Sequence, residues 1–229
     1  MEFRKPSQNF NKGLGRLAPQ ACLAACALVA ALGLARAETP SASLTYTKIM
    51  KGSSPEFLSV TVNRQGEGVY DGRRIEETPH PRSFKLSAET TQRLFDLAQS
   101  LGYFQSLKLE SGRKVANLGR KTLVYEDNGQ KSQTEFNYTL RREAQDLTNL
   151  FERISTVQEH IATLEHAIKF DHLSLPKELL QIQIDLDKQA LADPQLMVPT
   201  LEQISRGSKF LHLAQVRAQN ILQRLQTNN

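Results

Sequence analysis

The residues with the most chemical character gather in one stretch, "QEHIATLEHAIKFDH", residues 158–172. It holds three of the five histidines of the chain, and an acidic residue directly precedes each of them. Such a cluster has three uses in proteins: it supplies ligands for a metal ion, groups for acid–base catalysis, or the solvent-facing side of a helix. The spacing of the side chains decides among them.

The histidine spacing favours a solvent-facing side. Ligands that share a metal ion on one helix lie three or four residues apart, as in the H-E-x-x-H and H-x-x-E-H motifs of zinc proteases. His160 and His166 are six residues apart and so point about 120° away from each other. Both lie off the apolar stripe that must face the core, which is Val157, Ile161, Leu164 and Ile168. We therefore expect a solvated polar face here, without metal ligands or catalytic groups.

A second candidate is the basic loop "GRKVANLGRK", residues 112–121, which repeats Gly-Arg-Lys after seven residues. Its four cations, Arg113, Lys114, Arg120 and Lys121, are of the type that holds a phosphate or an acidic polysaccharide. Cations in exposed loops are usually solvated, and Glu110 and Glu126 flank this loop, so an anion site formed by these four residues is the alternative to a solvated loop. It is the one candidate binding site that the sequence offers.

Other catalytic motifs are incomplete or missing. "SLPK", residues 174–177, matches the S-x-x-K motif of serine acyl-transferring enzymes, but the companion S-D-N and K-T-G motifs are absent. Ser174 is more simply interpreted as a helix N-cap. The sequence also contains no glycine-rich phosphate loop and no serine nucleophile elbow. We therefore predict no catalytic residue, no metal ligand and no cofactor.

The first 37 residues have the features of a cleavable signal peptide. A basic segment precedes the apolar run "ACLAACALVAALGLA", and "ARA" supplies the small residues that a signal peptidase recognises. The run is shorter than the roughly 20 apolar residues of a membrane-spanning helix. We expect cleavage after Ala37 and export to the periplasm or the extracellular space. The alternatives are an N-terminal membrane anchor and lipidation of Cys26, which is disfavoured because most apolar residues follow that cysteine.

The composition of the remaining chain excludes several classes of protein. Both cysteines lie in the leader, so residues 38–229 have no disulfide and no thiol chemistry. The leader carries five basic residues and one acidic residue, a net charge of +4, and the whole chain carries +5, which leaves +1 for residues 38–229. Because no overall field of one sign remains, we expect no nucleic-acid partner and find no overall charge that favours an anionic membrane surface.

Residues 38–139 have mostly the period of β-strands. "FLSVTVN" alternates apolar and polar residues, and "KTLVYEDNGQKSQTEFNY" has two extended runs around Asn128-Gly129, a dipeptide typical of tight hairpin turns. Further short runs are "SLTYTKIM", "VYDG" and "PRSFKLS". One helix interrupts them, with Ser87 placed to cap its start and Gly102 to follow its end. We predict an α+β fold: an antiparallel sheet of about five or six strands with one packed helix.

From about residue 140 the period becomes helical. A long helix carries the histidine stretch, a second follows Ser174 and Pro176, a third element begins with Asp193 as its cap, and a last helix follows Gly207. We expect a C-terminal antiparallel helical assembly over residues 140–229. Since no linker rich in proline, glycine or serine lies near residue 140, this region should pack on the sheet domain.

The segments "LSVTVNRQGEGVYDG", "FKLSAETTQRLFDLAQSLGYF" and "LVYEDNGQ" resemble small α+β domains of uncharacterised exported bacterial proteins. The resemblance covers residues 43–150 and consists of turns and apolar positions. It implies the fold and export, and it implies no activity.

Together these features predict an exported, non-enzymatic protein that binds a partner or forms a structural part of the cell envelope. Its partner would be an unknown protein or envelope component, and no segment after the leader is expected to span a membrane. The alternatives are a hydrolase whose site is assembled from scattered residues, or an enzyme inhibitor. A pocket lined by acidic groups or histidines with shifted pKa values would favour an enzyme, and an apolar surface patch would favour binding.

Overall fold

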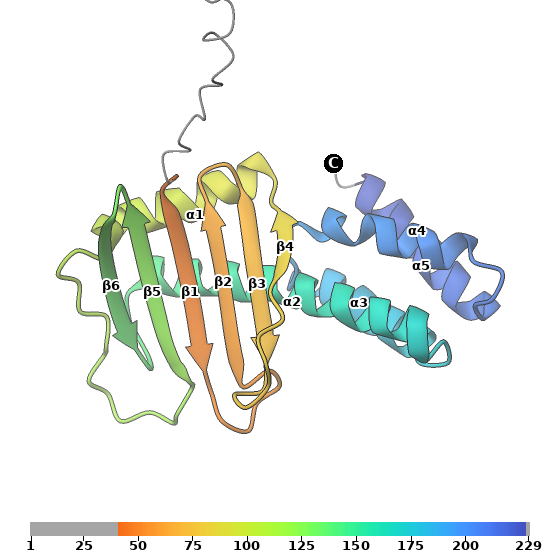
Figure 1. The fold of residues 1–229 in the computed structure, drawn as a ribbon, viewed down its shortest axis with the longest axis horizontal. Helices are drawn as coiled ribbons and strands as arrows, with labels where there is room; N and C mark the ends of the chain where they lie inside the picture. Colours follow the sequence, from red (N-terminus) through yellow and green to blue (C-terminus); the bar gives the residue numbers. More distant parts are fainter. Residues whose placement is uncertain (1–40, 228–229) are drawn as a thin grey trace, which may run out of the picture. The chain divides into compact units, whose positions relative to one another are not determined.

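The computed structural model describes residues 41–227, and within them an antiparallel sheet of six strands forms the first part of the fold (Figure 1). The expected signal peptide, residues 1–37, lies outside the described residues. The strands are β1 (Ser43–Ile49), β2 (Phe57–Asn63), β3 (Glu67–Arg73), β4 (Arg82–Lys85), β5 (Arg120–Asp127) and β6 (Gln130–Phe136). They lie side by side in the order β4-β3-β2-β1-β5-β6.

Local sequence patterns account for the strands and their turns. In β2 the alternate residues Leu58, Val60 and Val62 are buried, as a strand with one covered face requires. Asn128 and Gly129 connect β5 and β6 with φ angles of 49° and 77°, a conformation that asparagine and glycine tolerate best. The predicted hairpin is confirmed.

Helix α1 (Ala88–Ser100) has the predicted ends. The Ser87 hydroxyl accepts a hydrogen bond from the backbone N–H of Thr90, at 3.1 Å, and so caps the helix start. The helix closes at Leu101, and Gly102 follows with a φ of 61°. A short 3₁₀ turn, η1 (Gly102–Phe104), then leads the chain back toward the sheet.

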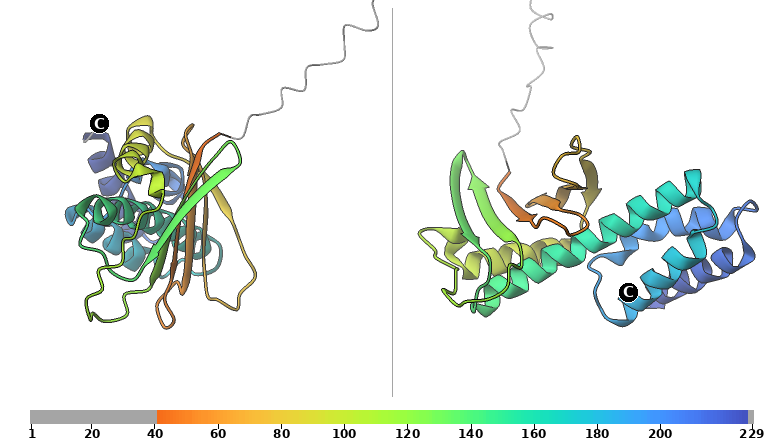
Figure 2. Two further views of the ribbon diagram at one scale, coloured as in Figure 1. Left: turned by 90° about the vertical axis from the view of Figure 1, so that its left-hand side faces the viewer. Right: turned by 90° about the horizontal axis from the view of Figure 1, so that it is seen from below.

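The C-terminal part of the chain is helical. Its elements are α2 (Arg142–Phe170), α3 (Leu175–Asp187), the 3₁₀ turn η2 (Pro194–Met197), α4 (Val198–Arg206) and α5 (His212–Thr227). Helices α1 and α2 cover one face of the sheet, as the turned view shows (Figure 2). The described fold is therefore an α+β fold with packed C-terminal helices, as the sequence predicts.

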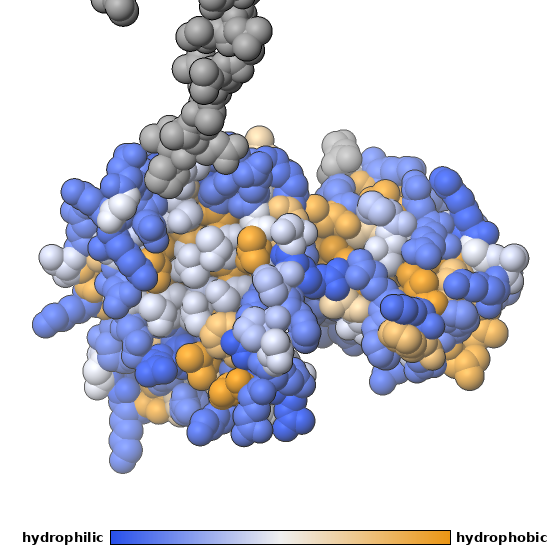
Figure 3. Space-filling view, in the orientation of Figure 1, coloured by the Kyte–Doolittle hydropathy of each residue, from blue (hydrophilic) through white to orange (hydrophobic). Residues whose placement is uncertain are grey.

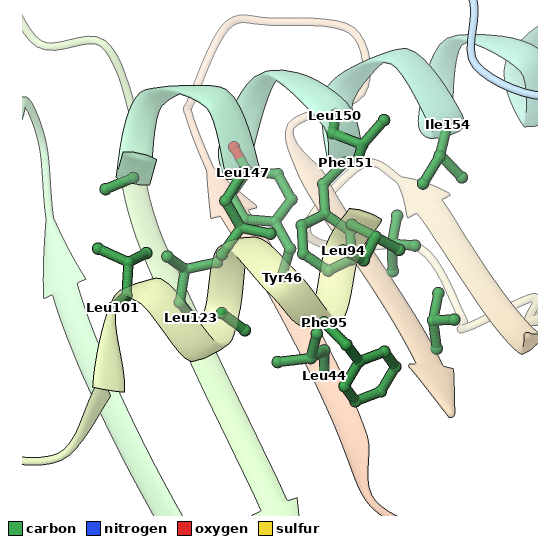
Figure 4. Packing of buried hydrophobic residues seen from close by; sticks show 14 of the residues in the cluster. Leu44, Tyr46, Leu94, Phe95, Leu101, Leu123, Leu147, Leu150, Phe151 and Ile154 are labelled. Carbon is green, nitrogen blue, oxygen red and sulfur yellow. The ribbon is translucent and has the colours of Figure 1, made fainter. Parts of the chain in front are cut away.

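Helix α2 belongs to two apolar cores. Its first half packs against α1 and the sheet, where Leu147 and Phe151 lie beside Tyr46 of β1 and Ile154 belongs to the same cluster (Figure 4). Its second half, from Val157 onward, packs against the other C-terminal helices. No helix among residues 41–227 is both long enough and apolar enough to cross a bilayer.

Two of the predicted helix caps are wrong. The Ser174 hydroxyl donates to the carbonyl of Asp171, at 3.0 Å, and does not cap α3, because Ser174 already has helical backbone angles. Asp193 does not cap η2 with its side chain. Its φ of 54° places it in the left-handed region, and its carboxylate instead contacts Ser87 at the start of α1.

Candidate functional site

The histidine stretch is only partly the solvated face that the sequence predicts. His160 is buried, with 8% of its surface exposed, and its Nε2 lies 3.0 Å from Oδ2 of Asp185 in α3. The prediction was wrong for His160 because α3 folds back along α2 and covers it. His166 is exposed, and its ring contacts Phe170 with the centroids 5.1 Å apart. The third, His172, makes a hydrogen bond through Nε2 to the carbonyl of Ile168, at 2.7 Å.

The basic loop does not bring its four cations together in one arrangement. Arg120 and Lys121 are successive residues of β5, so their side chains point to opposite faces of the sheet. Lys121 donates to the carbonyls of Leu118 and Asn137, at 3.2 and 3.1 Å, and Arg120 lies 3.9 Å from a carboxylate oxygen of Glu135. Arg113 and Lys114 are exposed, before the strand. Anion binding by this loop stays a prediction, and the structure gives it no preformed site.

The strongest candidate site is a hollow of about 540 Å³ between β3, the loop that follows it, and the middle of α2. Residues of both parts of the fold line this Glu159 hollow. Its polar lining includes Tyr70, Arg74, His80, Arg82 and Glu159. The hollow therefore combines titratable groups of both charge signs with a tyrosine hydroxyl.

Glu159 is the unusual group in this hollow. Burial raises the pKa of its carboxyl from 4.5 to about 7, and a hydrogen bond from the Tyr70 hydroxyl, at 3.4 Å, partly offsets that rise. No ion pair within the described residues joins Glu159 to a cation. A carboxyl with a pKa near neutrality in a hollow is a recognised feature of functional sites.

Glu152 lies seven residues before Glu159 on the same face of α2, and its carboxylate has the hydrogen-bond and ion-pair partners that Glu159 lacks. Its Oε1 accepts hydrogen bonds from the Tyr46 hydroxyl at 2.8 Å and from Nζ of Lys48 at 3.0 Å. Because seven residues make about two helical turns, Glu152 and Glu159 both face the sheet. The two carboxyls thus have matching tyrosine partners, and only Glu152 also has a lysine.

The position of Tyr70 depends on the glycine two residues later. A Cβ atom at Gly72 would lie 1.9 Å from the Tyr70 hydroxyl oxygen, far inside van der Waals contact. Gly72 therefore leaves the space that the Tyr70 ring occupies along β3 as it reaches toward Glu159. Burial, and secondarily the charge of Glu159, raise the pKa of the Tyr70 hydroxyl well above its ordinary value. Tyr70 thus stays protonated and acts as a hydrogen-bond donor.

Arg73 shapes the loop at the rim of the hollow. Its Nε lies 3.0 Å from Oδ2 of Asp71, and its Nη1 donates to the carbonyls of Ile75 and Glu77 at 3.2 and 2.8 Å. This guanidinium holds the backbone of the loop in place. The neighbouring Arg74 side chain is exposed and makes no hydrogen bond to a described residue, and its charge interacts with the Glu56 carboxylate.

Arg82, the first residue of β4, links the strand side of the hollow to α2. Its Nη2 lies 2.7 Å from Oε2 of Glu165, which lies on α2. Arg82 still has further N–H groups on its guanidinium, because this ion pair uses one nitrogen. His80 is exposed between two prolines of the loop.

In the sequence, Glu159 stands out only as the acidic residue before His160, and no pattern predicts the hollow that it shares with Tyr70 and Arg82. Tyr70 and Glu159 are 89 positions apart, so no local pattern joins them. One signal was available: Glu152 and Glu159 repeat at a seven-residue interval on the inward side of α2, where a buried stripe predicts apolar residues. Among residues 41–227, no group of three or more histidine, aspartate or glutamate side chains is arranged to hold a metal ion.

Comparisons with known proteins give one family match. Residues 50–158 match the family model described as "Domain of unknown function (DUF6438)", which covers 109 of the 229 residues. No curated protein matches the chain. The match agrees with the expected uncharacterised domain. It includes Tyr70 and the rim loop, ends one residue before Glu159, and leaves out most of the C-terminal helices.

Proposed function

We propose that the protein is an exported, non-enzymatic binding protein of the cell envelope, and that the Glu159 hollow binds an anionic group of its ligand. The observation that carries the proposal is the Glu159 carboxyl, which is mostly buried and has no ion-pair partner among the described residues. Burying an ionisable group is unfavourable unless its surroundings or a ligand compensate. The carboxyl avoids this cost by keeping its proton, and an anionic ligand that accepts a hydrogen bond from its O–H would favour the protonated form.

The charge of the hollow favours an anion. At a pH below about 7 the Glu159 carboxyl is protonated and has an O–H to donate. Arg74 and Arg82 add guanidinium groups, which bind carboxylate and phosphate oxygens with paired hydrogen bonds. An anion bound beside Glu159 would raise the pKa of this carboxyl further, so binding should take up a proton near neutral pH.

Three simple anions test this proposal: citrate, inorganic phosphate and galacturonate. We expect at least one of them, at millimolar concentration, to shift the backbone NMR signals of the rim loop and α2 around Glu159, with an affinity that falls as the pH rises above 7. Arg74→Gln should weaken the binding, whereas Arg93→Gln, on the exposed surface of α1, should not. The proposed anion site is wrong if none of the three anions shifts these signals, or if Arg93→Gln weakens anion binding as much as Arg74→Gln does.

A second candidate function is acid–base catalysis by Glu159. The observation that favours it is the pKa of about 7, because a general base works best when its pKa lies near the working pH. Tyr70, whose hydroxyl contacts Glu159, is a weak nucleophile because its pKa is raised. Hydrolysis of simple ester, glycoside or phosphate probes that is lost in Glu159→Gln would favour the enzyme over the binding protein.

Export rests on the leader and has its own test. The intact mass of the protein recovered from the envelope should begin at Glu38, after cleavage behind "ARA". A lipid-modified chain beginning at Cys26, or an uncleaved chain in the membrane fraction, would contradict this processing.

A further inference from the structure

Two helix–helix turns of the C-terminal region lie against each other. The turn between α2 and α3 contains His172, and the turn between α4 and α5 contains Phe210. The two rings meet edge to face, with centroids 5.0 Å apart and planes at 83°. Residues 169–177 and 206–213 therefore form one continuous surface, which we call the helical tip.

The helical tip exposes large apolar side chains. Their exposed fractions are 67% for Phe170, 76% for Leu173, 46% for Leu211 and 52% for Leu213. Leu173 and Leu211 lie in the turns, and Phe170 and Leu213 lie at the adjoining ends of α2 and α5, so both segments of the tip contribute. The space-filling view shows hydrophobic surface at this end of the C-terminal helices (Figure 3). Grouped exposed apolar residues mark sites that contact a partner or a membrane.

The helical tip is also basic. Its two segments contain Lys169, Lys177, Arg206 and Lys209 against the single acid Asp171, a net charge of 4 − 1 = +3, and Arg206 is paired at 3.5 Å with Glu202 of α4. Residues 38–229 carry +1 in total, so the rest of that chain carries −2. Positive charge is therefore concentrated next to the exposed apolar residues of the tip, although residues 38–229 as a whole are nearly neutral.

We propose that the helical tip inserts into the surface of an anionic lipid bilayer. Interfacial binding requires apolar side chains such as phenylalanine and leucine with lysines beside them. The apolar groups enter the headgroup region, and the cations remain at the charged membrane surface. Nζ of Lys169 lies 5.0 Å from the centroid of the Phe170 ring, and Nζ of Lys209 lies 5.1 Å from that of Phe210. Each ammonium thus stays close to an aromatic ring, with its apolar stem available to cover the surface.

The shape of the tip favours a bilayer over a protein groove or an acidic peptide. The apolar residues lie at the turns, where two helical hairpins end, and not along a helix face. The hollows of about 540 Å³ at Glu159 and about 550 Å³ at Tyr125 are both lined by residues outside the tip. A deformable lipid surface can accept protruding side chains without a complementary cavity.

A single introduced tryptophan tests insertion, because the natural chain has none. In Leu173→Trp, the fluorescence should shift to the blue and be quenched by brominated lipid in vesicles of phosphatidylglycerol and phosphatidylcholine. The matched control is Leu140→Trp, at an exposed leucine that precedes α2, and its fluorescence should not change. The N-terminus is the same in both variants, so a difference between their fluorescence responses is caused by the tryptophan at the helical tip.

Charge variants test the lipid specificity. In Lys169→Gln Lys209→Gln, binding to the same vesicles should weaken about 25-fold, since one basic residue near an anionic surface contributes about fivefold. Lys131→Gln, on β6, should leave vesicle binding unchanged.

Three results would overturn the proposal. The first is equal quenching of both tryptophans, and the second is equal binding to pure phosphatidylcholine vesicles. The third is a blue shift of Leu173→Trp that grows with protein concentration and needs no lipid, which would show that a second copy of the chain covers the tip.

Discussion

The carboxylate of Asp193 contacts Ser87, the N-cap of α1, which lies 106 positions earlier in the chain. This carboxylate accepts hydrogen bonds from the backbone N–H of Ser87 at 2.6 Å and from the Ser87 hydroxyl at 2.8 Å. The hydroxyl of Thr90 donates to the same carboxylate at 2.6 Å. A carboxylate at a helix N-terminus satisfies free N–H groups and interacts favourably with the helix dipole. Asp193 therefore connects the C-terminal helices to the helix that packs on the sheet.

We expect Asp193→Ala to lower the free energy of unfolding by about 1–3 kcal/mol, because it removes three charge-assisted hydrogen bonds at a helix start. Chemical denaturation measures the loss. The matched control is Asp146→Ala, whose carboxylate is exposed and 4.0 Å from Arg142, and which should cost less than about 0.5 kcal/mol. Equal losses in the two variants would show that the contact with Ser87 does not stabilise the fold.

The two cores should unfold together, because α2 runs through both. Leu164→Ala, at a fully buried position among the C-terminal helices, should cost about 2–5 kcal/mol. Hydrogen exchange should show that the slowest amides of the sheet lose protection by a similar amount. Ile161→Ala is the matched control, with a smaller effect since Ile161 is only partly buried. Unchanged protection in the sheet would mean that the two parts unfold separately.

The features that the sequence predicts well are local. The alternation in β2, the turn at Asn128 and Gly129, and the ends of α1 each depend on residues within a few positions of one another. Their physical causes are backbone conformation and capping, which short segments already express.

The features that the sequence does not predict are contacts between distant residues. His160 meets Asp185 over 25 positions, and Asp193 meets Ser87 over 106. Asp185 lies in α3 and Asp193 directly precedes η2, so local rules predict exposure for the first and capping of the following helix for the second. Only the packing of α3 on α2, and of the C-terminal helices beside α1, determines their real partners.

His160→Ala should destabilise the fold more than His166→Ala does. The first change removes a buried hydrogen bond between α2 and α3 and should cost about 1–3 kcal/mol. The second changes an exposed ring and should cost less than about 0.5 kcal/mol. Thermal melts with and without a chelator measure both effects and should be unaffected by the chelator. Equal melting points for the two variants would contradict the role of the Asp185 contact.

The raised pKa of Glu159 makes stability depend on pH with a defined sign. The carboxyl has a pKa of about 7 in the folded protein and 4.5 as its ordinary value, so the folded state holds the proton more tightly than the unfolded state. The stabilisation by this group is therefore complete below about pH 4.5 and is lost as the pH rises to about 7.

Glu159→Gln should remove this pH dependence, because glutamine resembles the protonated carboxyl in size and stays neutral. At about pH 4 the variant and the natural protein should have similar free energies of unfolding, and at about pH 8 the variant should be more stable by about 1–3 kcal/mol. Chemical denaturation at a series of pH values measures the difference. In Tyr70→Phe the change should move to higher pH, since the lost hydroxyl donates the hydrogen bond that lowers the pKa of Glu159. A difference between Glu159→Gln and the natural protein that stays constant from acid to alkaline pH would show that the Glu159 carboxyl titrates as an ordinary surface group.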